Sequence, residues 1–221
     1  MFKEWIKTLR RYFQRANNVL AKDINGKPFS KGNQLIFRLS FWVIACVVVW
    51  FLPKGLSKEF IDYIKDIFAI FVGFFVTVLC FVFDKLDTKR VLSEEERNAL
   101  PVDQRGDAMS DVKLKQEHNY TVRFFYTIGL IIMFSTVVIL LLIPNIFWDG
   151  WFNLDLKGYE FVKSLDAISL DSIKLFLHLS LCVVYRIVVI MLTIKVFYYT
   201  SYSVSSLLQV LINKKKLETW S

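Results

Sequence analysis

The chain has 221 residues, a formal net charge of +8, a hydrophobic share of 55% and 21 Phe against 8 Gly and 4 Pro. Its positive mean hydropathy and long uncharged stretches exclude an ordinary soluble domain. Residues 124–148 contain no charge, and this stretch exceeds the roughly 20 apolar residues that a spanning helix needs. The sequence therefore predicts an all-α integral membrane protein.

Residues 1–34 predict a basic, amphipathic cytoplasmic segment. Charges recur throughout its start and no small-residue cleavage site follows, so we do not expect a signal peptide. Its apolar residues fall on one helical face, as in helices that lie on anionic lipid. The candidate lipid-surface residues are Lys3, Lys7, Arg10, Arg11 and Arg15.

Residues 35–200 predict a four-helix transmembrane domain. The expected spans lie at about 35–52, 60–83, 122–147 and 173–195. Lys and Arg gather before the first span, between spans two and three, and near the C-terminus, whereas the other two connections carry few. By the positive-inside rule, both termini and the central loop should be cytoplasmic.

The loop at 84–120 predicts a structured cytoplasmic hairpin. Ser93 and Glu96 form a capping box, and Ser110 offers a second helix cap with no breaker before the third span. We therefore expect the third helix to begin well before the membrane. The candidate residues for docking a soluble partner are Glu94, Glu95, Glu96, Arg97, Lys113 and Lys115.

Residues 201–221 predict a cytoplasmic tail that contains a surface helix. An apolar stripe there lies opposite a polar one that includes Ser203 and Ser206. The apolar stripe consists of Val204, Leu207, Leu208 and Leu211. A fifth span is not expected, because it would carry the three consecutive lysines at 214–216 to the other side.

The sequence contains none of the usual signatures of catalysis. It lacks a Gly-rich phosphate loop, a His-Glu-x-x-His motif and a nucleophile elbow. The three cysteines lie inside apolar runs and have no ligand spacing. We therefore expect no enzyme activity and no catalytic, cofactor-binding or metal-binding residues. The positive charge flanks the spans, so orientation and lipid contact explain it without direct nucleic-acid binding.

Arg186 is predicted to lie near mid-membrane. It stands about eleven residues from either end of the fourth span, or about 16 Å at helical rise, with no acid at that depth. The expected partners are Thr77, Ser135, Thr136, Tyr185 or a freed carbonyl. Two interpretations stay open: a buried arginine that fixes packing, or a pore lining in which His178, Cys182 and either Tyr185 or Arg186 share a helical stripe.

Span two carries small residues at intervals of four. These residues are Ala69, Gly73 and Thr77, and such spacing permits two helices to approach closely. The sequence does not distinguish packing within one subunit from packing between subunits.

Residues 67–87 read IFAIFVGFFVTVLCFVFDKLD, a Gly-Phe-Phe-x-Thr run that ends at a charged exit. With the four-span layout, this resembles small bacterial membrane proteins of antiphage defence systems, among them the membrane subunit of the Kiwa system. The resemblance implies an inner-membrane homo-oligomer that senses phage attack and docks a soluble, DNA-binding cytoplasmic partner. It assigns no functional residue.

Two functional hypotheses follow. The first is a sensor and scaffold that recruits a soluble cytoplasmic effector through the 84–120 loop and the termini. The alternative is an oligomeric pore-forming effector that depolarises the membrane, with Arg186 on its path. A transporter is weaker, because the spans show few Gly or Pro breaks and no inverted repeat.

Overall fold

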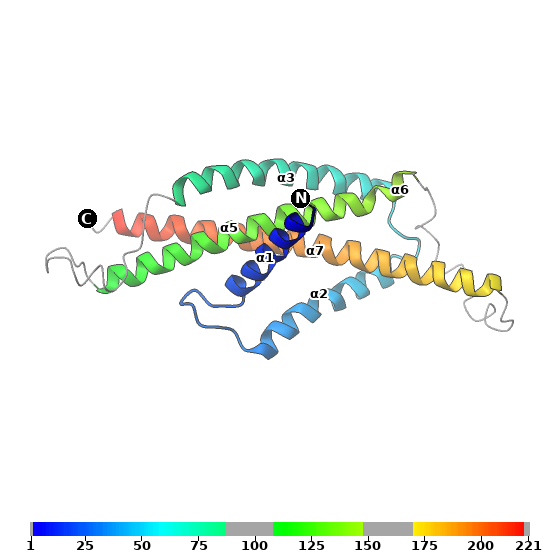
Figure 1. The fold of residues 1–221 in the computed structure, drawn as a ribbon, viewed down its shortest axis with the longest axis horizontal. Helices are drawn as coiled ribbons and strands as arrows, with labels where there is room; N and C mark the ends of the chain where they lie inside the picture. Colours follow the sequence, from blue (N-terminus) through cyan, green and yellow to red (C-terminus); the bar gives the residue numbers. More distant parts are fainter. Residues whose placement is uncertain (1, 87–107, 148–169, 219–221) are drawn as a thin grey trace. The chain divides into compact units, whose positions relative to one another are not determined.

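The computed structural model describes residues 2–86, 108–147 and 170–218, and their regular structure is helical apart from one isolated bridge between Lys22 and Pro28. The helices are α1 Phe2–Leu20, α2 Lys31–Phe51, α3 Lys58–Leu86, α5 Ala108–Leu142, α6 Pro144–Phe147 and α7 Leu170–Glu218 (Figure 1). The helices α2, α3, α5 and α7 are long and apolar enough to cross a membrane. For the described residues, this confirms the predicted all-α fold with four helices able to span a membrane.

Serine caps define where α2 and α3 begin. The amide of Asn33 donates to Ser30 Oγ at 3.3 Å, and the amide of Phe60 donates to Ser57 Oγ at 3.2 Å. Each cap satisfies an amide that has no partner within its own helix. Between the two helices, Gly55 has a φ of +93°, which favours glycine.

Helix α5 extends well before the predicted third span. It contains 35 residues, or about 52 Å at helical rise. It begins at Ala108, two residues before Ser110, so this serine lies inside the first turn instead of capping it. It ends at Leu142 because Pro144 cannot continue an α-helix, and Pro144 opens α6 instead. The predicted third span, about 122–147, thus comprises the end of α5 and all of α6.

Helix α7 is much longer than the predicted fourth span. It contains 49 residues, or about 74 Å, and residues 201–218 continue it without a break. Ser203 and Ser206 are buried, whereas Val204 and Leu208 are more than half exposed. This is the reverse of a surface helix in water, and it indicates that the exposed stripe faces lipid or protein. The predicted separate tail helix is thus the end of α7, with its serine side inward.

The helices divide between two compact units, which are described separately. The first unit comprises 1–34, 74–131 and 198–221, and the second comprises 35–73 and 132–197. The first unit therefore holds α1, the end of α3, the start of α5 and the end of α7. The second holds most of α2, the start of α3, the end of α5 with α6, and the first part of α7.

Candidate functional site

In the first unit, α1 packs on α5 through its C-terminal half. The hydroxyl of Tyr12 donates to the carbonyl of Tyr126 at 3.0 Å, and the two rings lie 5.4 Å apart. One turn further along α1, Ala16 is fully buried. Gly129 permits this approach, because a Cβ there would overlap the Tyr12 hydroxyl. The sequence reasoning missed both Tyr12 and Gly129.

The environment of Tyr12 favours its neutral form. Burial raises the pKa of the Tyr12 phenol above its ordinary value, and the nearby phenol of Tyr126 raises this pKa further. The neutral hydroxyl is the form that donates to the α5 carbonyl. The docked position of α1 therefore depends on a proton that stays bound at neutral pH.

The turn between α1 and α2 has its own internal structure. The amide of Lys27 donates to Asp23 Oδ1 at 2.7 Å, and the amide of Asp23 donates to the Lys27 carbonyl at 2.6 Å. Gly26, with a φ of +84°, closes this turn in a conformation that other residues rarely adopt. The turn consequently presents fixed backbone carbonyls to α5.

Polar side chains on one face of α5 bind that turn. Gln116 Nε2 donates to Asn25 Oδ1 at 3.2 Å, and Asn119 Nδ2 donates to the carbonyl of Ile24 at 2.8 Å. Arg123, four residues further along, completes the row, because residues three and four apart share a helix face. The row fixes the start of the chain against α5.

Arg123 joins three segments of the first unit. Its Nη2 donates to the Lys22 carbonyl, and its Nη1 donates to the hydroxyl of Tyr202 on α7 at 3.1 Å. The side chain is 6% exposed. The sequence reasoning did not single out Arg123, although a lone cation directly before the uncharged stretch at 124–148 was an available signal. The arginine ties the N-terminal turn to both α5 and α7.

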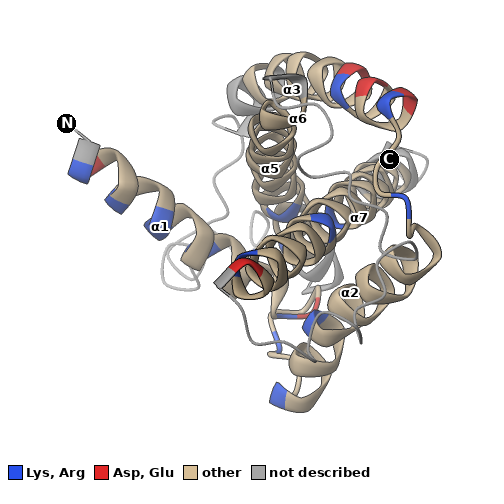
Figure 2. Cartoon of the chain, turned by 90° about the vertical axis from the view of Figure 1, so that its right-hand side faces the viewer, with Lys and Arg blue, Asp and Glu red and all other residues tan. Residues whose placement is uncertain are grey.

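The outer side of α1 is cationic. All five predicted lipid-surface residues are exposed: Lys3, Lys7, Arg10, Arg11 and Arg15. Trp5 and Ile6 are also exposed, by 58% and 46%. Figure 2 shows the N-terminal half of α1 extending away from the other helices of its unit, with basic residues along it. An exposed helix with basic and aromatic residues is the composition that anionic lipid surfaces bind.

In the second unit, Arg186 is buried beside the turn between α2 and α3. Its Nη1 donates to the carbonyl of Pro53 at 3.2 Å, and the residue is 1% exposed. The hydroxyl of Tyr185 donates to the carbonyl of Leu141 at 2.8 Å, and it accepts a bond from Asn145 at 2.6 Å. One of the partners expected for Arg186 was a backbone carbonyl outside the helical hydrogen bonds, and the carbonyl of Pro53 is such a partner.

These contacts give the level of Arg186 relative to the neighbouring helices. Pro53 follows the end of α2, and Leu141 is next to the last residue of α5. Arg186 therefore lies level with the ends of its neighbouring helices and not with their midpoints. The prediction counted residues along the fourth span alone, and α7 is far longer than its neighbours.

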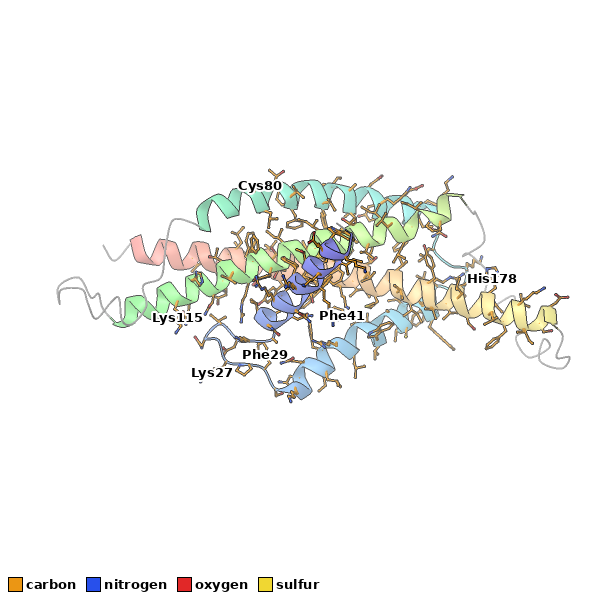
Figure 3. All side chains as sticks on the ribbon, viewed as in Figure 1. Lys27, Phe29, Phe41, Cys80, Lys115 and His178 are labelled. Atoms are coloured by element: carbon orange, nitrogen blue, oxygen red, sulfur yellow. The ribbon has the colours of Figure 1, made fainter. Side chains whose placement is uncertain are left out.

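Lys195 is a partly buried cation that lies against the middle of α2. Its ammonium stands 5.8 Å from the ring centre of Phe41 and 5.7 Å from that of Phe134. Phe41, labelled in Figure 3, is the middle residue of α2. Lys195 follows Arg186 by nine residues, or about 14 Å along α7. The sequence reasoning treated Lys195 only as the end of a span.

The predicted intramembrane polar residues come from α3 and α7. Tyr185 and Arg186 bond to different elements, as described above. His178 lies two turns nearer the start of α7 and is partly buried (Figure 3). Thr77 belongs to the other unit, where its side chain is exposed. Burial and a hydrogen bond to a backbone carbonyl are what the packing interpretation expects of Arg186.

The predicted packing face of α3 is exposed. Ala69, Gly73 and Thr77 are all exposed, and a Cβ added at Gly73 would meet nothing within 4 Å. Of the two kinds of packing that the sequence left open, close approach to another helix of the same chain is thus not seen at these positions.

The predicted docking residues are only partly within the described structure. Residues 94–97 lie outside it, Lys113 lies in α5 with its side chain not described, and Lys115 is exposed on the same helix (Figure 3). Within the described ranges, no cluster of three or more His, Cys, Asp or Glu residues could hold a metal ion. Comparison with protein-family models, curated proteins and solved structures gave no match.

Proposed function

We propose that this chain is a non-enzymatic, multi-pass subunit of the bacterial inner membrane that senses the membrane surface through α1 and scaffolds a soluble cytoplasmic effector. The observation that supports this best is the docking of α1 and its turn on α5 and α7 by Tyr12, Gln116, Asn119 and Arg123. The lipid-facing helix is thereby joined to the two helices that extend beyond the predicted spans.

The hydrogen bonds that dock α1 on its neighbours and the contacts of its cations with anionic lipid have comparable energies. Three neutral docking hydrogen bonds at about 0.5–1.5 kcal/mol each, with the bond from charged Arg123 at about 1.5–3 kcal/mol, contribute about 3–7.5 kcal/mol. Five exposed cations at about 1 kcal/mol each on an anionic surface contribute about 5 kcal/mol. Since the cations are exposed while α1 is docked, both sets of contacts can form together. A loss of anionic lipid contact would therefore remove about half of the free energy that holds α1 in place.

The start of α5 is the proposed platform for the effector. It carries exposed Lys115 close to the residues that bind the N-terminal turn, so a change in α1 reaches the platform through α5 itself. The role in antiphage defence and the homo-oligomeric state are supported by the resemblance in layout to the membrane subunit of the Kiwa system. The proposed partner is a protein, and the chain itself makes no direct nucleic-acid contact.

Co-purification tests the scaffold role. The full chain should retain a soluble protein after mild crosslinking in its native membrane, and replacing residues 93–117 with a Gly/Ser linker should release it. Lys54→Gln, an exposed cation beside Pro53, is the control that should retain it. Equal retention by the linker variant would contradict the docking site. Ionic current in planar bilayers, lost in Arg186→Gln, would instead favour the pore-forming alternative.

A further inference from the structure

The turn between α1 and α2 contains the dipeptide Asn25-Gly26. Asn25 is the only asparagine of the sequence that directly precedes a glycine. In such a pair the backbone nitrogen of glycine can approach the side-chain amide carbon of asparagine, because glycine has no Cβ in the way. Asparagine is a thermolabile residue for this reason. Both residues are exposed, so the pair has the neighbour and the solvent access that deamidation requires.

Deamidation of Asn25 consumes only water. The nitrogen of Gly26 loses its proton to solvent and forms a bond to Cγ of Asn25, and the side-chain nitrogen takes up a proton and leaves as ammonia. The product is a closed succinimide ring, and water then breaks one of the two carbon–nitrogen bonds of that ring. Cleavage at Cγ gives aspartate, whereas cleavage at the backbone carbonyl carbon leaves the main chain running through the side chain as isoaspartate.

The docked turn holds both reacting groups on other partners. The amide of Gly26 donates to the carbonyl of Asp23 at 2.9 Å, so the proton that must leave is already bonded. Asn25 Oδ1 accepts a bond from Gln116 Nε2 at 3.2 Å, which ties the side chain to α5. Ring closure needs the amide carbon of Asn25 and the nitrogen of Gly26 in a near-attack arrangement, and both bonds therefore oppose it.

Helix α5 determines how often the turn opens. Asn119 Nδ2 donates to the carbonyl of Ile24 at 2.8 Å, and Arg123 Nη2 donates to the carbonyl of Lys22. Opening of the turn is a local unfolding event in which these bonds break while the helices stay folded. The rate of a reaction that proceeds from the open state follows the population of that state. Asn25 should thus react slowly while the turn is docked and faster once it leaves α5.

We propose that Asn25 is a deamidation site that docking on α5 protects and that release of the turn activates. The isoaspartate product carries an extra carbon in the main chain between the Ile24 carbonyl and the Gly26 amide. These two groups then cannot both return to their partners, Asn119 and Asp23. A turn that reacts while released is thereby prevented from docking again. The proposal rests on the bonds of the turn and not on the proposed sensor function.

Ageing of the full chain in nanodiscs at neutral pH tests this site. Mass spectrometry measures the conversion of Asn25, and a synthetic peptide of residues 21–30 gives the unprotected rate. We expect the wild type to react at least about tenfold more slowly than the peptide, and Arg123→Gln to react about tenfold faster than the wild type. Lys54→Gln, an exposed cation outside the turn, should react like the wild type. Asn33, exposed but followed by Gln34, should stay unmodified in every sample.

Two further measurements keep the outcome decisive. Gln116→Ala removes a single bond at the surface of α5 and should speed the reaction, whereas a slower reaction would show that Gln116 promotes ring closure and would overturn the proposal. Brief trypsin digestion of the aged wild type should release turn fragments that contain more isoaspartate than the uncut chains do. Equal isoaspartate in both fractions would contradict the block on docking. A wild type that reacts at the rate of the peptide would overturn the protection itself.

Discussion

The hydroxyl of Tyr12 lies in the space that a side chain at Gly129 would occupy. Glycine at this position lets the phenol reach the backbone of α5 and donate to the Tyr126 carbonyl. A residue of α1 and a residue more than one hundred positions later are thereby interdependent. The relationship provides a direct way to release α1 without touching its lipid-facing side.

Gly129→Ala should weaken the docking of α1. The added methyl overlaps Tyr12, and such overpacking costs about 1–3 kcal/mol. The readout is hydrogen exchange of α1 amides, which should become faster. Gly73→Ala is the control, because a Cβ there meets nothing within 4 Å, and exchange in α1 should stay unchanged. Equal effects of the two substitutions would contradict the docking.

The docking of α1 should weaken at high pH. Because burial raises the pKa of Tyr12, the folded protein holds its phenolic proton more tightly than the unfolded chain does. The resulting stabilisation is complete below the ordinary tyrosine pKa of about 10 and is lost progressively as the pH rises above it. Hydrogen exchange of α1 between pH 9 and 11.5 should show this loss in the wild type. Tyr12→Phe should lack that part of the pH dependence, and an identical profile would contradict the assignment.

Arg123→Gln should free the turn between α1 and α2. The substitution removes the bond to the Lys22 carbonyl and the bond to Tyr202, and bonds to a charged donor are each worth about 1.5–3 kcal/mol. Limited proteolysis should cut within residues 21–30 faster than in the wild type. The control is Arg15→Gln, which removes an exposed charge from α1. A turn that resists cleavage equally in both variants would contradict the role of Arg123.

Arg186→Gln should destabilise the second unit without affecting conduction. The bond from Arg186 to the Pro53 carbonyl is buried, so its loss should cost about 1.5–3 kcal/mol and lower the melting temperature in detergent. Lys54→Gln, next to Pro53 but exposed, should melt like the wild type. If Arg186→Gln melts normally but changes the anion preference of a current, then the residue lines a pore.

The membrane-spanning architecture could be predicted because lipid demands long apolar helices, and such helices are visible as uncharged stretches. The extension of α5 was also predictable, since nothing between Ser110 and the third span breaks a helix. The continuation of α7 beyond residue 200 was not predicted. The sequence holds no helix breaker there, but the lysines at 214–216 suggested a separate tail. Helix ends in membrane proteins depend on neighbours as well as on local sequence.

The level of a charged residue relative to neighbouring helices could not be predicted from one helix alone. Counting along the fourth span put Arg186 at its middle, whereas Pro53 and Leu141 place it at the ends of α2 and α5. Lys195 was overlooked because its partners are the rings of Phe41 and Phe134, which come from two other helices. Tyr12 and Arg123 were missed for the same reason. Their partners are backbone carbonyls, and the sequence does not indicate which carbonyls a fold brings within reach.

Hydrogen exchange of α1 and of residues 22–25 in nanodiscs of anionic or zwitterionic phospholipid tests the central claim that α1 senses the membrane surface while docked on α5. We predict slower exchange in the anionic discs. We also predict that the difference disappears when Lys3, Lys7, Arg10, Arg11 and Arg15 are all replaced by Gln. Equal exchange of wild-type α1 in the two kinds of disc would contradict the claim.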